Sequence, residues 1–584
     1  MRALQYLNKY LKKYFFKLLL GIIITVISRV FSLFAPRLIG ESLTAIENYL
    51  SNHQGDLAAL KSLLLNNIFI IIGATLLSGF FTFLMRQTII NVSRYIEFDL
   101  KNEIYSHYQR LTQRFYKNNR TGDLMSRISE DVSKVRMYVG PAIMYSINTA
   151  TLFICVITLM FNIAPKLSVY TLIPLPLLSI TIYKLSKVIN ARSTVVQEML
   201  SKLSSYTQEI FSGMSVVKSY GLESNTNEKF NAMAQKARGI NMNLVEVQAW
   251  FFPLMILLIG LSNLIVIFTG GRQYMDGSIE IGVLAEFIIY INMLTWPVAV
   301  VGWVTSVVQQ AEASQKRINA FLNESVEILN GPGVDLSIRG EISFKNVTLI
   351  YPDTQIKALD NISFVIKKGE SLGIIGKVGS GKSSVLNLIN RLYDPQYGKI
   401  LLDDHDIKTF KLNQLRGFIG NVTQNAFLFS ESIEDNIKFG KQGATDQEII
   451  EASKKADIHS SIKKFRHGYK TLLGERGLTL SGGQIQRLSI ARALIKDPKI
   501  LLFDDCLSAV DTDTEEKILK NLSEFCQGKT SVIVSHRISS VKDADQIIVL
   551  DRGKIIENGP HQKLLDIKGF YFDLFNKQQT EKDI

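Results

Sequence analysis

The residues most clearly suited to chemistry lie in a glycine-rich segment, 376–383, which reads GKVGSGKS and fits the phosphate-loop pattern G-x-x-x-x-G-K-S. The segment follows the apolar run 371–375, a predicted strand, and leads into a helix expected to begin near Ser384. Such a loop turns backbone N–H groups toward phosphate oxygens, and the helix N-terminus adds a favourable partial charge. We expect Lys382 to pair with the β- and γ-phosphates of a nucleotide, and the Ser383 hydroxyl to hold Mg²⁺. The predicted nucleotide-binding residues of this segment are Gly376, Lys377, Val378, Gly379, Ser380, Gly381, Lys382, Ser383 and Ser384.

Two adjacent carboxylates follow a second apolar run. Residues 500–503 read ILLF, as a buried parallel strand should, and the run ends in Asp504 and Asp505. A carboxylate at the carboxyl end of such a strand is suited to holding Mg²⁺, so we predict Asp504 as a metal ligand. Asp505 would lie next to the place of an attacking water, which makes it a candidate catalytic base. The alternative for this pair is a capping role at the end of the strand.

A third candidate segment, residues 480–484, reads LSGGQ and precedes a predicted helix. Ser481 can cap that helix, and the two glycines expose backbone N–H groups at its N-terminus, which forms an anion site. The chain already has one phosphate loop, so a second site of this kind, facing a different nucleotide, implies a partner copy. The residues predicted to contact the partner's nucleotide are Ser481, Gly482, Gly483 and Gln484.

The first half of the 584-residue chain is built differently. It carries six long apolar runs, each close to the about 20 residues that a membrane helix needs, at 16–39, 63–86, 140–163, 166–186, 250–271 and 281–305. Lysine and arginine are concentrated before the first run and in the loops 87–139 and 187–249. Since basic residues mark the cytosolic side, we expect both termini and both long loops in the cytosol. This distribution accounts for much of the net charge of +13 without nucleic acid as a partner.

The pattern changes after the stretch NGPG at 330–333, which breaks the helical periodicity. Beyond it, short strands alternate with helices, as in an α/β domain. We therefore predict an α-helical six-span transmembrane domain over 1–325, a linker over 326–340 and an α/β phosphate-loop nucleotide-binding domain over 341–584. The three cysteines, Cys155, Cys506 and Cys526, show no metal-ligand or redox spacing.

These motifs and their order resemble the nucleotide-binding domain of the ABC transporter superfamily, whose signature motif matches residues 480–484. The resemblance implies ATP and Mg²⁺ as cofactors and gives further residues a role. Tyr351 resembles the aromatic residue that stacks on adenine. Gln424 resembles the glutamine that senses Mg²⁺ and the membrane domain, and is counted as both a metal and a catalytic residue. Other matching segments are the loop 474–477 that touches the membrane helices, the D-loop 508–511 with Asp511, and the switch histidine His536, which contacts the γ-phosphate.

The first half is similar to the membrane domains of exporters in the same superfamily. Residues 114–124 look like the first coupling region and residues 211–218 like the second. The resemblance implies a head-to-tail pair of nucleotide domains, with each ATP between one chain's phosphate loop and the other chain's signature motif. Closure of that pair would change the side of the membrane to which the membrane cavity opens.

One position departs from the family pattern. The family usually has a glutamate directly after the Mg²⁺ aspartate, where this chain has Asp505. Aspartate is one methylene shorter, so its carboxylate should lie too far back to hold the attacking water well. The resemblance offers two readings: a heterodimer whose partner keeps the glutamate, which we favour, or a homodimer with slow hydrolysis.

The function that the resemblance implies is ATP-driven export of small amphipathic or hydrophobic molecules by a multidrug-type half-transporter. The alternatives are a flippase for lipids or lipid precursors, a siderophore importer that uses the exporter fold, and a peptide exporter. A soluble ABC ATPase acting on ribosomes or DNA is disfavoured by the six spans. The expected partners are a second half-transporter, membrane lipid and a small amphipathic substrate, and the expected location is a bacterial plasma membrane. Within the spans, Arg29 is a candidate for the substrate cavity, with a structural pair or snorkelling as the alternative.

Overall fold

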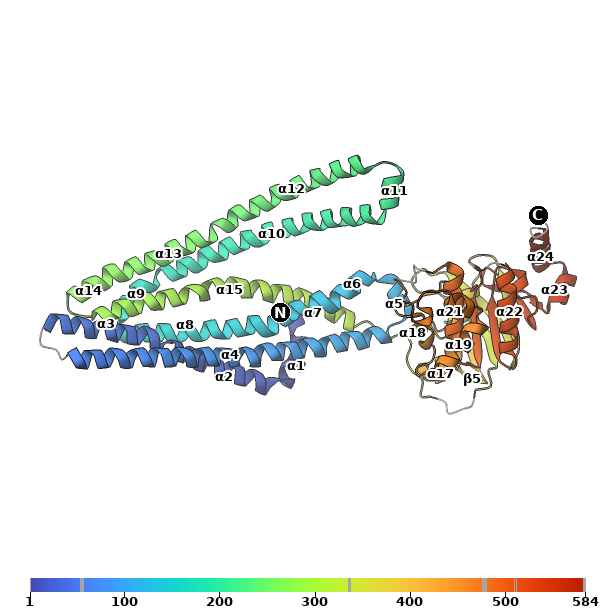
Figure 1. The fold of residues 1–584 in the computed structure, drawn as a ribbon, viewed down its shortest axis with the longest axis horizontal. Coiled ribbons are helices and arrows are strands. Elements are labelled where there is room, and N and C mark those ends of the chain that lie inside the picture. Colours follow the sequence, from blue (N-terminus) through green and yellow to red (C-terminus); the bar gives the residue numbers. More distant parts are fainter. Residues whose placement is uncertain are drawn as a thin grey trace. The chain divides into compact units, whose positions relative to one another are not determined.

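The computed structural model describes residues 2–52, 57–333, 338–474, 480–508, 510 and 512–580. The chain forms two compact units, which we call the helical unit (Met1–Gln109 and Arg120–Glu324) and the α/β unit (Arg110–Asn119 and Ser325–Ile584). Figure 1 shows the elements of both. Residues 110–119 belong to the α/β unit, whereas the residues directly before and after them belong to the helical unit. The first predicted cytosolic loop, 87–139, therefore contributes to both units.

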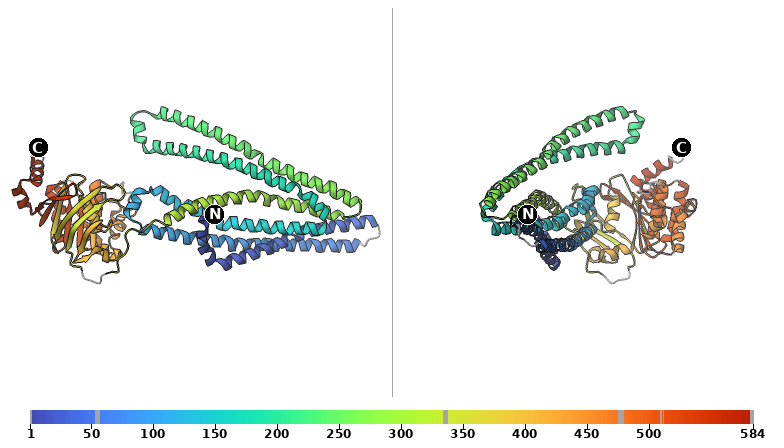
Figure 2. Two further views of the ribbon diagram at one scale, coloured as in Figure 1. Left: turned by 180° about the vertical axis from the view of Figure 1, so that it is seen from behind. Right: turned by 60° about the vertical axis from the view of Figure 1, so that its left-hand side comes forward.

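The described residues of the helical unit form helices and short connections. Besides the 3₁₀ turn Ala3–Leu7 and three π-helical turns, its helices are α1 (Asn8–Lys13), α2 (Phe15–Ser32), α3 (Phe34–Asn52), α4 (Leu57–Arg110), α6 (Thr121–Ser126), α7 (Val132–Met137), α8 (Ile143–Ile163), α9 (Pro165–Leu172), α10 (Pro174–Ser212), α11 (Met214–Ser219), α12 (Glu223–Ala249), α13 (Phe251–Ile265), α14 (Gly271–Met275) and α15 (Ile281–Leu322). Helices α10 and α12 lie side by side and are joined through α11 (Figure 2).

Five helical stretches are long and apolar enough to cross a membrane, and they contain five of the six predicted spans: Phe15–Ser51, Leu57–Arg110, Thr121–Ile163, Glu223–Met275 and Ile281–Leu322. The remaining predicted span, 166–186, is not among them; it lies in α9 and the start of α10, with Ile173 between the two helices. Pro174, the first residue of α10, lacks a backbone N–H and cannot continue the hydrogen bonding of α9, which explains the division. Ile173 itself keeps helical dihedral angles, with φ −55° and ψ −41°. The region is helical, as predicted for a span, and is interrupted once, at Ile173.

The core of the helical unit is formed mainly by α8 and α15. Phe287, Tyr290 and Leu294 of α15 are fully buried, and they belong to one cluster with Val156 and Met160 of α8. The spacing of the three α15 residues, three and four apart, places them on one face of the helix. The outer faces of the helices carry many exposed apolar side chains, as helices in contact with lipid should.

The α/β unit contains two sheets. The four-stranded antiparallel sheet has the order β2-β1-β4-β5, and the six-stranded sheet has the order β10-β9-β3-β8-β7-β6. In the second sheet β9, β3, β8, β7 and β6 run parallel, and β10 pairs antiparallel with β9. The strands are β1 (Ile342–Ile350), β2 (Lys357–Ile366), β3 (Ser371–Gly376), β4 (Tyr397–Leu402), β5 (His405–Asp406), β6 (Ile419–Val422), β7 (Ile500–Asp504), β8 (Thr530–Val534), β9 (Gln546–Asp551) and β10 (Lys554–Gly559).

Ten helices belong to the described part of this unit: α5 (Gln113–Asn118), α16 (Lys382–Ile389), α17 (Leu412–Gly417), α18 (Ile433–Lys438), α19 (Asp446–Lys455), α20 (His459–Lys463), α21 (Gly482–Leu494), α22 (Thr512–Cys526), α23 (His561–Ile567) and α24 (Phe570–Thr580). The parallel strands β3, β7 and β8 are nearly continuous apolar runs and are buried, as central parallel strands should be. Their register aligns Ile374, Val534 and Asp504 in one row across the sheet. The segments that follow these strands therefore emerge at the same sheet edge, where open α/β sheets bind ligands.

Candidate nucleotide-binding site

The glycine-rich segment forms the turn between β3 and α16. Gly381, directly before α16, has φ +101°, and a Cβ at this position would lie 2.2 Å from the Ala358 carbonyl oxygen. A larger side chain is therefore excluded by both the backbone conformation and the space. The Ser380 hydroxyl is buried and has no hydrogen-bond partner among the described residues, which leaves it available to an oxygen-rich ligand.

Lys382, the first residue of α16, folds its side chain back over this turn. Its Nζ donates to the carbonyl oxygens of Gly376 and Lys377, each at 2.9 Å. Burial lowers the pKa of the Lys382 ammonium, an effect that the charges of Asp505 and Asp504 oppose. The ammonium is thus held at the centre of the loop, where a phosphate chain cradled by the backbone N–H groups would meet it.

Ser383 and Asp504 are brought together across 121 residues of sequence. The Ser383 hydroxyl donates to Asp504 Oδ1 at 2.9 Å. Burial raises the pKa of the Asp504 carboxyl, and the bond from Ser383 opposes this effect. A hydroxyl beside a carboxylate is an oxygen donor set that would suit Mg²⁺, so these two side chains could help to hold that ion. Among the described residues no cluster of three His, Cys, Asp or Glu side chains could hold a metal by itself.

Asp505 has an unusual backbone conformation, with φ +44°, in the region that aspartate tolerates better than most residues. Its backbone N–H donates to the Val534 carbonyl at 2.8 Å, so the turn after β7 is fastened to β8. Gln424, which lies in the connection after β6, donates through Nε2 to Asp505 Oδ2 at 3.3 Å. Two of the three residues predicted to take part in catalysis, Asp505 and Gln424, therefore meet directly, and His536 is the third.

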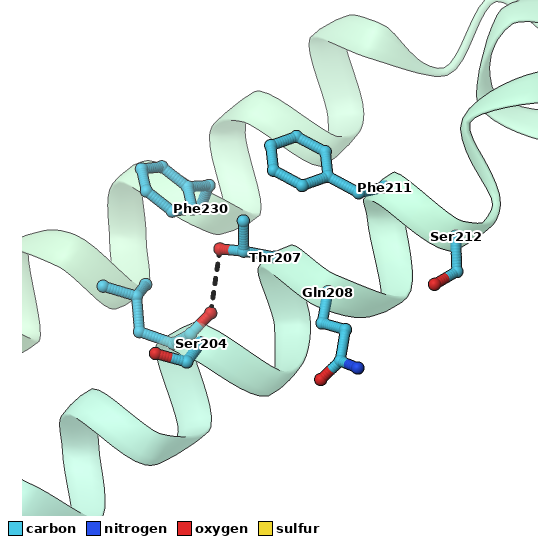
Figure 3. A pocket seen from close by; sticks show the side chains of 7 residues that line it. Ser204, Thr207, Gln208, Phe211, Ser212 and Phe230 are labelled. Carbon is cyan, nitrogen blue, oxygen red and sulfur yellow. Dashed lines mark hydrogen bonds between the residues drawn. The ribbon is translucent and has the colours of Figure 1, made fainter. Parts of the chain in front are cut away.

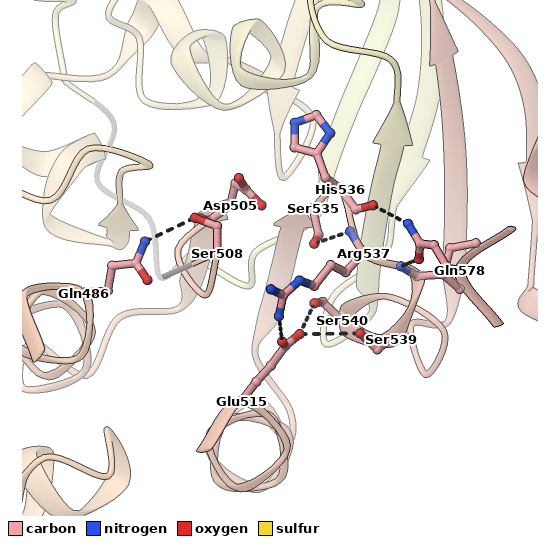
Figure 4. Close-up of polar contacts among 11 residues, drawn as sticks. Gln486, Asp505, Ser508, Glu515, Ser535, His536, Arg537, Ser539, Ser540 and Gln578 are labelled. Carbon is pink, nitrogen blue, oxygen red and sulfur yellow. Dashed lines mark hydrogen bonds and ion pairs between the residues drawn. The ribbon is translucent and has the colours of Figure 1, made fainter. Parts of the chain in front are cut away.

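His536 lies in the loop after β8, on the same side as Asp505 (Figure 4). Ser535 N–H donates to the Ile374 carbonyl at 3.2 Å, so this loop starts from the sheet edge that carries the glycine-rich turn. Two residues that the sequence motifs do not single out contact this loop, Glu515 of α22 and Gln578 of α24 (Figure 4). Both act on the loop through tertiary contacts, for which the sequence carries no local signal.

Tyr351 borders the other side of the phosphate loop. Its hydroxyl lies 2.9 Å from Ser384 Oγ, and its ring meets the Tyr393 ring edge-on. Lys117 of α5 lies 5.6 Å from the centroid of each ring. An aromatic surface beside the loop suits the stacking of a base, and Lys117 brings the predicted first coupling region to that surface.

The same segment is fastened by an ion pair. Arg114 Nη1 lies 2.5 Å from Glu327 Oε1, and the Thr112 hydroxyl donates to Glu327 Oε2 at 3.1 Å. Glu327 follows the last helix of the helical unit in sequence, so residues 110–119 and the start of the second half are joined within the α/β unit.

The predicted signature segment caps α21. Ser481 is its N-cap: its Oγ accepts from Gln484 N–H at 3.4 Å, and Gln484 Oε1 accepts from Ser481 N–H at 3.0 Å. Gly482 and Gly483 form the first turn of the helix. In the described part of the chain no hydrogen bond links this segment to residues 376–384. Ala509 and Asp511 of the predicted D-loop and residues 475–477 of the predicted contact loop lie outside the described residues.

Two of the thiols lie in this unit. Burial raises the pKa of Cys506 to about 12 and that of Cys526 to about 11. Both therefore stay protonated near neutral pH, which agrees with the absence of a redox spacing in the sequence.

Hollows occur at two places among the described helices of the helical unit. One, of about 350 Å³, lies among α8, α10 and α15 and is lined by Phe153, Tyr183, Lys187 and Thr305, among others. The other is an open groove of about 600 Å³ between α10 and α12, with Phe211 and Phe230 along it (Figure 3). Phe211 is 69% exposed and begins the predicted second coupling region.

Membrane-length helices and a phosphate-loop domain in one chain define a nucleotide-driven membrane protein, and comparisons with known proteins give its family. Residues 18–298 match the ABC transporter transmembrane region, and residues 359–508 match the ABC transporter domain. The multidrug resistance-like ATP-binding protein MdlA of Buchnera aphidicola (subsp. Schizaphis graminum) is 36% identical over 86% of this chain and 87% of its own. The probable multidrug resistance ABC transporter ATP-binding/permease protein YheI of Bacillus subtilis is 35% identical over 94% of this chain and 93% of its own.

The chain is also similar to a lipid flippase and to an ABC exporter of known structure. The ATP-dependent lipid A-core flippase of Syntrophus aciditrophicus is 34% identical over 83% of this chain and 81% of its own. The solved structure of a bacterial Atm1-family ABC exporter with ATP bound matches with a TM-score of 0.78 and 25% identity, over 98% of each chain.

These matches show that the present chain belongs to the ABC transporter family and has the exporter-type membrane region of that family. It is a multi-pass membrane protein with a nucleotide-binding domain.

Proposed function

We propose that this chain is one half of an ATP-driven exporter of small amphipathic or hydrophobic molecules in a bacterial plasma membrane, with both termini and the nucleotide-binding domain in the cytosol. The observation that carries the proposal is the meeting of Lys382, Ser383 and Asp504 at one sheet edge, in a chain that also has membrane-length helices. The resemblance to multidrug resistance-like relatives supports the substrate class.

The site residues take the following roles in this proposal. Ser383, Asp504 and Gln424 hold Mg²⁺, which neutralises charge on the β- and γ-phosphates when bound. Lys382 holds the phosphates in place, and Tyr351 stacks on adenine. His536 contacts the γ-phosphate, and Asp505 orients the attacking water. Because phosphoryl transfer depends on positioning and charge stabilisation, the placement of these groups decides the rate.

The site formed by this chain is weakened in our proposal. The Asp505 carboxylate is one methylene shorter than the glutamate usual in the family, and it is also engaged by Gln424. The intact signature segment, 481–484, then completes the stronger site of a partner half-transporter that keeps the glutamate. Ser481 caps the N-terminus of α21, and Gly482 and Gly483 form the first turn of this helix. In our proposal the backbone N–H groups of this turn bind the partner's ATP.

On the membrane side, the hollow among α8, α10 and α15 is our candidate for substrate contact. Its lining combines aromatic and aliphatic side chains with Lys187 and Thr305, which suits an amphipathic molecule. A second candidate function, a lipid flippase, is favoured by one observation: Arg29 lies within the first span and donates to the neutral Asn148 of α8. A cation at this depth with a neutral partner could receive an anionic headgroup.

Transport into sealed proteoliposomes tests the proposal. We expect ATP-dependent accumulation of a fluorescent amphipathic dye such as Hoechst 33342 in proteoliposomes of the purified pump. Accumulation should fall to the level without ATP in the Lys382→Ala variant. Movement of a fluorescent phospholipid between leaflets, without dye accumulation, would favour the flippase instead. ATP hydrolysis without movement of either probe would contradict the proposed substrate class.

A further inference from the structure

The loop that carries His536 has little backbone support of its own. Strand β8 pairs with β3 and β7 as far as Val534, and beyond it the Ser535 N–H bond to Ile374 is the last one to the sheet in residues 535–540. Short turns follow, such as the bond from Val541 N–H to the Ile538 carbonyl. Within the loop, the Ser535 hydroxyl accepts from the Arg537 N–H at 3.0 Å. The further support of the His536 peptide comes from side chains elsewhere in the chain.

Gln578 of α24 supplies such a contact from one side (Figure 4). Its Nε2 donates to the His536 carbonyl at 2.8 Å, and its Oε1 accepts from the Ile538 N–H at 2.9 Å. One primary amide thus pairs with the peptide groups on both sides of Arg537, as a neighbouring strand would. The amide fits in one orientation only, because the reversed one would place donor against donor and acceptor against acceptor.

The helix that presents Gln578 is itself fixed to the core. Tyr571 is fully buried, and its hydroxyl lies 2.6 Å from His561 Nδ1. Leu574 and Phe575 pack against the cluster that contains Ile538. These residues and Gln578 are three or four positions apart and share one face of α24. The amide is therefore held on a rigid element.

A second side chain fastens the opposite side of the loop. Glu515 is 3% exposed, forms an ion pair with Arg537 and accepts from the Ser540 hydroxyl at 2.7 Å. The His536 imidazole, by contrast, makes no hydrogen bond within the described part of the chain. Hydrogen bonds therefore fix the backbone around His536, whereas its imidazole ring remains available to a ligand.

From this arrangement we propose that Gln578 is a positioning residue for the switch histidine: its side-chain amide fixes the His536 peptide so that the imidazole faces the γ-phosphate. This inference rests on the proposed ATP-hydrolysing function. It makes the C-terminal helix α24 part of the catalytic machinery, although α24 itself does not touch the nucleotide in this proposal.

The test is a double-mutant cycle in the full-length chain purified without a partner half-transporter, so that no stronger partner site masks the effect, with Asp505→Glu present throughout so that the site of this chain turns over measurably. Gln578→Leu removes both hydrogen bonds, and we expect ATP turnover to fall about 10-fold, with the KM for ATP changed less than about twofold, because a small misplacement of a catalytic group is costly. Gln578→Glu should act similarly, since its carboxylate can accept from Ile538 but cannot donate to the His536 carbonyl. In a His536→Ala background, Gln578→Leu should add less than about a twofold change, because there is no longer a ring to position.

Gln579→Leu and Gln579→Glu are the matched controls, since Gln579 is the next residue of α24 and is exposed. We expect both to keep the turnover of the parent. An equal fall from Gln578→Leu in both backgrounds would overturn the inference and assign Gln578 a purely structural role. A fall in turnover from His536→Ala but none from Gln578→Leu would overturn the inference alone. No effect of His536→Ala would overturn it together with the catalytic role proposed for His536.

Discussion

The side-chain length of Asp505 is expected to have a large effect on the rate of ATP hydrolysis. Its left-handed backbone and its bond to Val534 fix the Cα, so the reach of the carboxylate depends on the number of methylenes. Asp505→Glu should therefore raise the ATP turnover of the site formed by this chain by at least about 10-fold, because general-base help is worth about 10²–10⁴-fold.

Steady-state ATP hydrolysis by the chain purified alone, before and after the substitution, measures this effect, because no stronger partner site then contributes to the turnover. Asp566→Glu on α23, an exposed aspartate, is the matched control and should leave turnover at the level of the parent. If the chain purified alone already hydrolyses ATP at ordinary exporter rates, and Asp505→Glu adds nothing, the weakened-site hypothesis is refuted.

Among single residues, the sequence allowed us to predict those site residues that belong to a local sequence motif. Lys382 and Ser383 follow a strand and open a helix, Asp504 ends another strand, and the parallel register brings the three together. Their roles toward ATP and Mg²⁺ stay predictions. Glu515 and Gln578 could not be found in this way, because each is one of many similar residues on a helix and gains its role only from the loop against which that helix packs.

Among the elements, helices were predicted from apolar length, and their interruptions were not. Pro174 and Pro176 were visible in the sequence, but the pattern of apolar residues continues across them, so 166–186 read as one span. The structure divides it at Ile173, since a proline cannot extend the hydrogen bonding of the helix before it. Apolar periodicity reports burial or lipid contact, whereas continuity of a helix depends on every backbone N–H.

The segment 110–119 gives a prediction at the scale of elements. Its ion pair, Arg114 with Glu327, is partly exposed, and such pairs stabilise by about 0–1 kcal/mol. We expect Arg114→Ala to lower the dye transported per ATP hydrolysed by about two- to fivefold, while the KM for ATP changes little, because the proposed coupling region is loosened and the nucleotide site is not.

Parallel measurements of dye accumulation and phosphate release in the same proteoliposomes give this ratio. The charge-swapped pair Arg114→Glu with Glu327→Arg is the control and should recover most of the loss. A loss that the swap does not reverse would show that the ion pair is not the cause.

For the whole molecule, the composition of the assembly is the central prediction. A head-to-tail pair needs two signature segments and two phosphate loops, and this chain supplies one of each. We expect the tagged chain, purified at native expression, to co-purify with a second half-transporter in equal amount. That partner should carry glutamate at the position equivalent to Asp505.

Intact-mass measurement of the purified complex decides this point. Two different masses in equal amount would support an asymmetric pump with one strong ATP site. Copies of this chain alone would mean a homodimer, in which Asp505 must serve in both sites, and would contradict our account of the substitution.

The chain crosses between its two units three times, near residues 109–110, 119–120 and 324–325. The nucleotide-binding unit is therefore discontinuous in sequence, and no single truncation releases it whole. A fragment beginning at residue 325 would lack α5, and with it the lysine beside Tyr351 and Tyr393 and the ion-pair partner of Glu327. Anyone who expresses this unit in isolation should graft residues 110–119 onto it, because the missing piece belongs to the surface on which adenine is proposed to rest.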